Sequence, residues 1–239
     1  MNPTTSRFDE LALPDCRALT AAEVEVALNP HPRLCVGILA DTSQSISPWI
    51  NELNAALRQW YEAMRADMHC RQCADVCLIT FGGRAQMLSP YTSMMDVDVE
   101  TIPSLTAQGD TPLGAAIHLA LDAVRERHRQ LADSGLPLFT PWLIVLTDGQ
   151  PNGELESAVK RLKAAGDAKR ILLFPIAIGP DADFQFLEQI AQPGRPPKQL
   201  KDIAHLSELF EWIRASVRTL FGSSTTDRAK LPPTSDWAL

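Results

Sequence analysis

Short apolar runs alternate along the chain with longer segments whose apolar residues recur every three or four positions. The apolar runs have strand length and cover residues 34–40, 76–81, 142–146 and 171–178. Uninterrupted runs of this length are typical of strands that are buried on both faces of a parallel sheet. The segments with helical spacing cover residues 50–64, 113–131, 155–162, 184–190 and 206–220. Each carries the apolar stripe of a helix that packs on one side.

This alternation predicts an α/β fold with a doubly wound, mostly parallel central sheet and helices on both faces, because right-handed crossovers return each helix to the sheet. Residues 85–88 are expected to form one short antiparallel edge strand, and Gln199 and Leu200 a last short strand. The 239 residues fit one large domain better than two. The expected organisation is an N-terminal extension packed on the domain (1–32), the domain itself (33–221) and a flexible C-terminal tail (222–239).

Charge and hydropathy exclude some partners. The formal net charge of -7 argues against a nucleic-acid surface. No apolar stretch is long enough to cross a bilayer, and the first residues lack the apolar core of a secretory signal. We therefore expect a cytoplasmic protein with no nucleic-acid or membrane partner.

Oxygen-bearing side chains follow two of the predicted strands and begin one helix. Asp41, Ser43 and Ser45 close the strand at 34–40, and Asp148 follows the strand at 142–146. Thr111 begins the helix at 113–131. Ligand-binding residues of open α/β sheets lie at the carboxyl ends of strands where the strand order reverses. If the strands that end at Asp41 and Asp148 are neighbours, all these side chains converge, and hard oxygen ligands suit Mg2+, Mn2+ or Ca2+. Each segment taken alone is equally explained as a helix cap or a turn.

The same residues resemble a known family. Asp-Thr-Ser-Gln-Ser at 41–45, Thr111 in Gly-Asp-Thr-Pro-Leu and Asp148 in Leu-Thr-Asp-Gly resemble the metal-ion-dependent adhesion site of von Willebrand factor type A (VWA) domains. The resemblance covers residues 33–221 and implies the Rossmann-like fold of that family. Asn-Pro-His-Pro-Arg at 29–33 further resembles the bacterial TerY-like branch, which is linked to tellurite resistance.

The resemblance implies a role for each side chain. The hydroxyls of Ser43 and Ser45 would ligate Mg2+ (or Mn2+ or Ca2+) directly, Thr111 directly or through water, and Asp41 and Asp148 largely through water. Because neutral hydroxyls leave much of the cation's charge uncompensated, an acidic residue of a protein partner would complete the shell. The chain would then be a divalent-metal-dependent protein–protein interaction module and not an enzyme. The TerY-like branch implies an adaptor in a bacterial stress-response or phosphorylation-linked system, with a protein kinase or a metal-dependent phosphatase as partner.

Two residues depart from the family pattern. Gln44 stands where the family commonly has Gly, so the turn must accommodate a side chain. Asp110 stands where the family has a small residue, and its carboxylate would either tighten metal binding or weaken the attraction of an acidic partner.

Two other functions are compatible with the sequence. One is a metal-dependent phosphotransferase or hydrolase that uses Asp41. Such an enzyme requires a second Asp, as acid/base, at the position where this chain has Ser43. The chain also lacks a phosphate-binding Gly-x-x-x-x-Gly-Lys loop and a Gly-x-Ser-x-Gly elbow. The other is a VWA scaffold that binds its partners away from the metal.

Cysteine and histidine give a weaker signal. Cys70, Cys73 and Cys77 have ligand-like spacing, but zinc commonly takes two separated pairs of ligands and no second pair is present. Free thiols in the core and in loops are therefore the favoured interpretation. The three histidines at 118, 128 and 205 have no acidic or nucleophilic partner by spacing.

Overall fold

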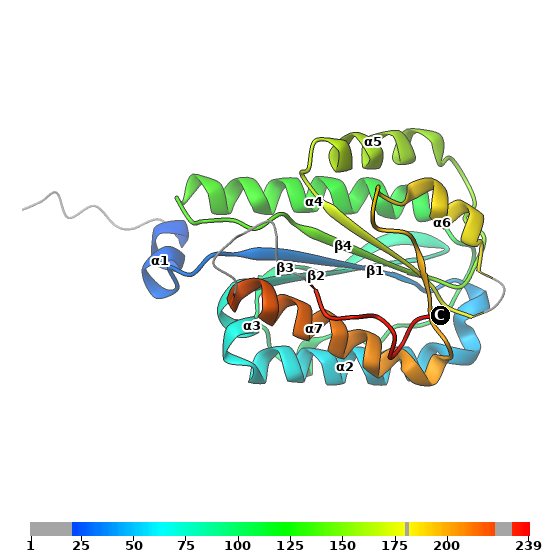
Figure 1. Cartoon of the computed structure of the whole chain (residues 1–239), viewed down its shortest axis with the longest axis horizontal. Coiled ribbons are helices and arrows are strands. Elements are labelled where there is room, and N and C mark those ends of the chain that lie inside the picture. The colour runs from blue at the N-terminus through cyan, green and yellow to red at the C-terminus, as the bar shows by residue number, and fades with distance from the viewer. Residues whose placement is uncertain (1–20, 180–181, 223–230) are drawn as a thin grey trace, which may run out of the picture.

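The computed structural model describes residues 21–179, 182–222 and 231–239. Its strands form one sheet in the order β3-β2-β1-β4-β5-β6 (Figure 1). The strands are β1 Leu34–Asp41, β2 Ala74–Gly82, β3 Arg84–Ser93, β4 Trp142–Thr147, β5 Leu172–Ala177 and β6 Lys198–Gln199. The α-helices are α1 Ala21–Leu28, α2 Ile50–Ala66, α3 Met68–Cys73, α4 Leu113–Asp133, α5 Glu156–Asp167, α6 Phe184–Ile190 and α7 Leu206–Gly222. Short 3-10 helices cover η1 Gln44–Trp49, η2 Val99–Thr101 and η3 Ile203–His205.

The strand order reverses at β1. This strand pairs in parallel with β2 on one side and with β4 on the other, and the sheet continues in parallel through β5 to β6. Strand β3 is the antiparallel edge, and it is longer than the predicted 85–88. The prediction of a doubly wound, mostly parallel sheet with one antiparallel edge strand is therefore confirmed.

Two core layers lie on opposite faces of the sheet. Helices α2, α3 and α7 cover one face, and α4, α5 and α6 cover the other (Figure 1). Successive residues of β1 face opposite layers, since Val36 and Ile38 join the α2/α7 layer while Cys35 and Leu39 join the α4 layer. Burial on both faces explains why the strands appear in the sequence as continuous apolar runs. None of the helices in the described residues is long and apolar enough to cross a membrane.

The cysteine-rich segment forms α3, a helix that the sequence analysis did not predict. The carboxylate of Asp67 caps it by accepting hydrogen bonds from the backbone N–H groups of His69 (3.0 Å) and Cys70 (3.2 Å). Cys70 and Cys73 are buried in the α2/α7 layer, whereas Cys77 of β2 is buried in the opposite layer. The sheet therefore separates Cys77 from the other two. Burial raises the pKa of Cys70 and of Cys77 to about 12, so both are protonated core thiols at neutral pH.

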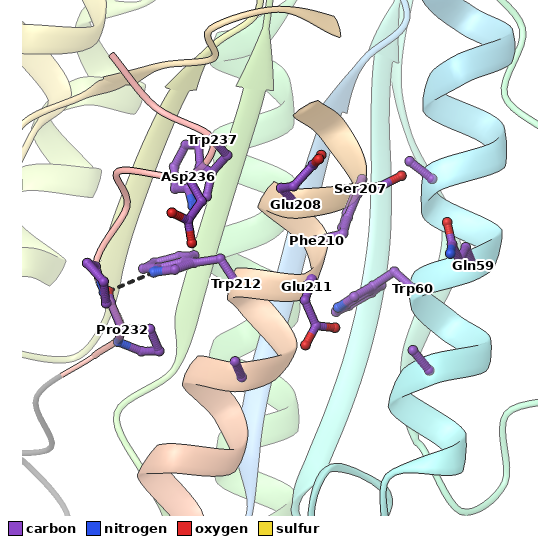
Figure 2. A pocket seen from close by; sticks show the side chains of 14 residues that line it. Gln59, Trp60, Ser207, Glu208, Phe210, Glu211, Trp212, Pro232, Asp236 and Trp237 are labelled. Atoms are coloured by element: carbon purple, nitrogen blue, oxygen red, sulfur yellow. Dashed lines mark hydrogen bonds between the residues drawn. The ribbon is translucent and has the colours of Figure 1, made fainter. Parts of the chain in front are cut away.

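The C-terminal end of the chain is packed against the domain. Of the predicted flexible tail at 222–239, Gly222 ends α7, residues 223–230 lie outside the described residues, and residues 231–239 contact α7 and β6. Trp237 is 1% exposed and its ring packs at a tilt against Trp212, whose indole N–H donates to the carbonyl of Pro232 at 2.9 Å (Figure 2). Burial of this tryptophan offsets the entropy lost in ordering the segment. The Leu239 N–H also donates to Gln199 (3.0 Å), which covers the β6 edge of the sheet.

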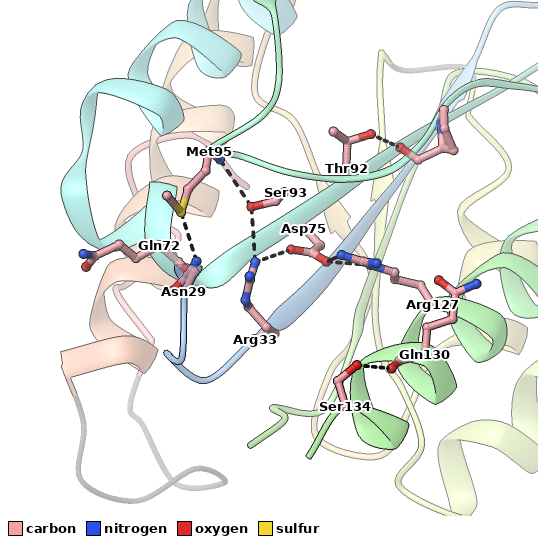
Figure 3. Close-up of polar contacts among 11 residues, drawn as sticks. Asn29, Arg33, Gln72, Asp75, Thr92, Ser93, Met95, Arg127, Gln130 and Ser134 are labelled. Atoms are coloured by element: carbon pink, nitrogen blue, oxygen red, sulfur yellow. Dashed lines mark hydrogen bonds and ion pairs between the residues drawn. The ribbon is translucent and has the colours of Figure 1, made fainter. Parts of the chain in front are cut away.

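The described part of the N-terminal extension contacts the amino-terminal edge of the sheet. Residues 1–20 of the extension predicted at 1–32 lie outside the described residues. Val26 of α1 packs against the α4 layer. Asn29 is buried, and its side-chain amide donates to the carbonyl of Gln72 at 2.7 Å (Figure 3).

A buried charge cluster joins the start of β1, the start of β2 and α4 (Figure 3). Asp75 is fully buried and accepts from Arg33 (Nη1 to Oδ1, 3.0 Å) and from Arg127 (Nη2 to Oδ2, 2.7 Å). Arg33, 1% exposed, also donates to the hydroxyl of Ser93 at 3.2 Å. Each buried charge in this cluster depends on its partners, because an isolated ion is strongly destabilised away from water.

Asp75→Asn tests this dependence. The substitution removes the buried negative charge that Arg33 and Arg127 both contact, so we expect the free energy of unfolding to fall by about 3–5 kcal/mol in urea titrations. Glu100→Gln is the control, since its ion pair with Arg58 is exposed and should contribute little. Equal stability of the two variants would contradict the conclusion that the buried arginines depend on Asp75.

Candidate functional site

The strand pairing brings two of the predicted segments together. Asp41 is the last residue of β1, and Asp148 directly follows β4. Because Ala40 of β1 lies opposite Leu146 of β4, the residues that follow each strand emerge side by side. This is the point at which the strand order reverses, where open α/β sheets bind their ligands.

Hydrogen bonds link four of the five predicted oxygen-bearing residues. The carboxylate of Asp41 accepts from the backbone N–H of Ser43 at 2.8 Å, and the hydroxyls of Ser43 and Ser45 lie 2.9 Å apart. The Ser45 hydroxyl donates to Oδ1 of Asp148 at 3.0 Å. Asp41, Ser43 and Asp148 are buried, while Ser45 is exposed and forms the outer edge of the group.

Gly149 shows that Thr111 belongs to the same group. A Cβ built on Gly149 would lie 3.3 Å from Oγ1 of Thr111, 3.5 Å from Oγ of Ser45 and 3.8 Å from Oδ2 of Asp41. Three oxygens from two separate segments, 41–45 and the start of α4, therefore lie around one small space beside Gly149 of a third segment. The hydroxyls and carboxylates that line it are the donor set of a hard divalent cation.

Backbone contacts between loops hold Thr111 beside Asp41. The Gln44 N–H donates to Gly109 (2.8 Å), the Gln108 N–H to Thr42 (2.8 Å) and the Gly83 N–H to Asp110 (2.7 Å). Gly109 has a positive φ of 62°, and a Cβ there would lie 2.6 Å from Cα of Gly83. Glycine is required at this position because no other residue permits the two loops to approach so closely.

Burial sets the electrostatics of Asp41. Desolvation raises the pKa of the Asp41 carboxyl, and hydrogen bonds from Thr147, Ser43 and Asp148 oppose that rise. The Thr147 hydroxyl donates to Oδ2 of Asp41 at 2.6 Å. The folded chain alone therefore holds the Asp41 carboxylate at an energetic cost, which a nearby cation would reduce.

The two departures from the family pattern lie at the edge of the group. Gln44 is exposed, its amide donates to the Ser47 hydroxyl at 2.9 Å, and its φ is not positive, so the turn accommodates a side chain without strain. Asp110 is exposed, and its backbone carbonyl, through the bond from Gly83, contributes to the loop packing.

Three contributing residues were not predicted. Thr147 fixes Asp41, Gly149 leaves the central space open, and the Asn152 backbone N–H donates to the Thr111 carbonyl at 3.0 Å. Thr147 and Gly149 flank Asp148 in the Leu-Thr-Asp-Gly segment, so that motif contained the signal. Asn152 gave none, because its partner is 41 positions away along the chain.

One contact of His118 was also missed. Its Nε2 lies 3.1 Å from the Ser157 hydroxyl, which is the geometry of a serine nucleophile and its base. However, Arg161 can only donate, and its Nη1 lies 2.7 Å from the His118 Nδ1. Nδ1 must therefore accept, which places the proton on Nε2. In that tautomer His118 has no lone pair with which to deprotonate Ser157, so the pair is not a nucleophilic site.

Comparison with known proteins now assigns the family. The family model of the von Willebrand factor type A domain matches residues 36–212, and the chain belongs to this family. Among curated proteins, none matches this sequence.

Solved structures share the fold. Proximal thread matrix protein 1 from the mussel byssus has a TM-score of 0.60 and 18% identity, with 78% of this chain and 46% of that chain covered. A von Willebrand factor type A protein from Catenulispora acidiphila gives 0.57 and 19%, with coverage of 79% and 43%. The manganese-loaded TRAP protein of Plasmodium vivax gives 0.55 and 21%, with coverage of 74% and 71%. The mussel protein has also been solved with zinc in its metal-ion-dependent adhesion site. This chain spans less than half of the first two proteins.

Asp41→Asn tests the electrostatic account. Since burial raises the folded-state pKa of Asp41, its stabilising contribution is full at acidic pH and is lost as pH rises through that raised pKa. In chelator at neutral pH, we expect calorimetry to give the variant a higher Tm than the wild type, because the amide removes the buried charge. At a pH low enough to protonate the carboxyl in both states, the two Tm values should converge. A variant that is less stable at neutral pH would contradict this account.

Proposed function

We propose that this VWA domain is a divalent-metal-dependent protein-interaction module whose cation is held by Asp41, Ser43, Ser45, Thr111 and Asp148. The observation that carries the proposal is the space beside Gly149, around which oxygens of Asp41, Ser45 and Thr111 lie. Membership of the VWA family and the zinc and manganese in two of the related structures support it. Mg2+ is the expected ion in the cell, with Mn2+ or Ca2+ as alternatives.

The residues divide the work of binding. Ser43, Ser45 and Thr111 present neutral hydroxyls, while the buried Asp41 and Asp148 supply negative charge. Thr147 and the Ser43 N–H keep the Asp41 carboxylate oriented when no cation is present. The bound cation would act as an electrophile that attracts a carboxylate. An Asp or Glu of a partner protein would then approach from the exposed side, where Ser45 lies.

The finer role rests on sequence resemblance. We propose a cytoplasmic adaptor of the TerY-like kind, in a stress-response or phosphorylation-linked system with a protein kinase or a metal-dependent phosphatase as partner. The support is the Asn-Pro-His-Pro-Arg segment at 29–33. In the fold, Asn29 and Arg33 make buried contacts at the amino-terminal edge of the sheet, which accounts for them structurally as well.

Hydrolysis with Asp41 as nucleophile is less well supported. One carboxylate oxygen of Asp41 accepts from the Ser43 N–H and the other accepts from the Thr147 hydroxyl. Both oxygens are thus engaged, and the residue two positions on is a serine that cannot serve as an acid/base partner.

Gly149→Ala tests the cation site. The added methyl would occupy the space among the oxygens, and Gly149 has no positive φ that would strain alanine. We expect Mn2+ binding, measured by calorimetry, to be lost while Tm changes little. Gly222→Ala is the matched control because a Cβ there meets nothing within 4 Å. Ser43→Ala combined with Asp148→Ala should abolish binding as well. Unchanged Mn2+ affinity in Gly149→Ala would refute the assignment.

A second prediction concerns the partner. Truncating the partner's carboxylate should cost on the order of 2–5 kcal/mol of affinity, since a desolvated cation would lose its counter-charge. EDTA should have a comparable effect, and so should Asp41→Ala, with the fold of the variant intact by circular dichroism.

The measurement is partner affinity in Mg2+, in EDTA and for Asp110→Gly. Equal affinity in all three would mean that the partner binds away from the metal, as a VWA scaffold would. A higher affinity for Asp110→Gly in Mg2+ alone would instead show that the extra carboxylate opposes an acidic partner.

A further inference from the structure

A second candidate surface lies at the other edge of the sheet. A pocket of about 790 Å3 opens between α4 and α5, beside the residues that lead into β4 and β5. The metal site lies at the carboxyl ends of the strands, whereas this pocket lies at their amino ends. Helix α4 begins next to Thr111, and its second half lines the pocket, so one helix spans both surfaces.

The pocket is basic although the protein is acidic. Five of its lining side chains are Arg or Lys and none is Asp or Glu, in a chain of net charge -7. Two of the five are already paired, Arg129 with Glu126 and Arg161 with Asp122. The other three are Arg125, Lys169 and Arg170, all exposed, and no carboxylate of the described residues forms an ion pair with them. These three cations are available to a ligand.

The base of the pocket is apolar. Leu121 and Val124 of α4, together with Ile171, are buried there, and Leu138 is partly buried. Apart from the imidazole of His128, the lining offers no aromatic ring on which nucleic-acid bases could stack. Arg and Lys side chains around an aliphatic pocket floor fit a ligand that carries both carboxylates and an aliphatic side chain.

Lys169 places its charge at the pocket from an unfavourable backbone conformation. Among the non-glycine residues that the structure describes, it alone has a positive φ, 53°. It directly follows Ala168, the C-cap of α5; its own N–H donates to Gly166 (2.8 Å) and the next N–H to Ala165 (2.9 Å). Helices that end with these two bonds usually carry glycine at this position. A lysine at this position adopts a less favourable backbone conformation than glycine would. We take this cost as a sign that the lysine side chain serves binding.

We propose that this pocket binds an acidic peptide segment of a partner protein, with an aliphatic side chain of the segment seated on Leu121, Val124 and Ile171. Charge complementarity with Arg125, Lys169 and Arg170 selects the segment, and the aliphatic anchor supplies contact area. The interaction needs no metal. It goes beyond the proposed function, because it gives the domain a second docking surface that can be occupied together with the metal site.

The test uses a fluorescent peptide of Asp-Asp-Leu repeats and anisotropy in EDTA, so that the metal site cannot contribute. We expect saturable binding that weakens as salt increases. Arg125→Glu with Lys169→Glu should lower the affinity roughly tenfold or more, because two attractions become repulsions. Arg58→Glu, on α2 at the other face of the sheet, reverses an exposed arginine outside the pocket and should leave the affinity unchanged.

A second variant separates binding from folding. Lys169→Gly relaxes the backbone, so Tm should rise while affinity for the peptide falls severalfold. No binding in EDTA, or equal affinity for the double variant and the wild type, would overturn the proposal. Equal affinity for an Asp-Asp-Ser peptide would refute the aliphatic anchor. Tighter binding of a single-stranded oligonucleotide than of the peptide would replace the acidic partner with nucleic acid.

Discussion

The parallel pairing of β1 with β4 is the constraint on which the rest of the site depends. It places the end of β1 against the end of β4, so that the Thr147 hydroxyl reaches Asp41 at 2.6 Å and the Ser45 hydroxyl reaches Asp148 at 3.0 Å. Residues more than 100 positions apart in the chain thereby come into contact. Because both strands are buried on both faces, a slip in their register would mispack their side chains against both helical layers as well as separate the oxygens.

The same edge of the sheet shows a compromise between stability and binding. A carboxylate that is 1% exposed and whose pKa is raised by burial would be a poor choice for stability alone. The close approach of Gly83 and Gly109 likewise excludes side chains that would restrict the unfolded chain. Such costs are expected where a protein holds a binding site in place before its ligand arrives.

Much of the fold and of the site was predictable from the sequence because the signals were local. Strands buried on both faces appear as apolar runs, and the helices α2, α4 and α7 carry regular stripes. The Asp-Thr-Ser-Gln-Ser segment and Leu-Thr-Asp-Gly both lie at strand ends, where ligand-binding residues are expected. The features that were missed depend on tertiary contacts. Helix α3 is only six residues long and is held by the ion pair of Asp67 with Arg214 of α7, and the C-terminal segment is ordered by Trp237 packing on Trp212. Neither contact has a pattern along the chain.

Anomalous diffraction from a crystal soaked in MnCl2 tests the central claim most directly, because it locates the cation without reference to a partner or an activity. The account predicts one strong manganese peak beside Gly149, within ligand distance of the Ser43 and Ser45 hydroxyls. Contact with Asp41 and Asp148 should be direct or through ordered water. A peak elsewhere on the domain, with no density among these oxygens, would contradict it.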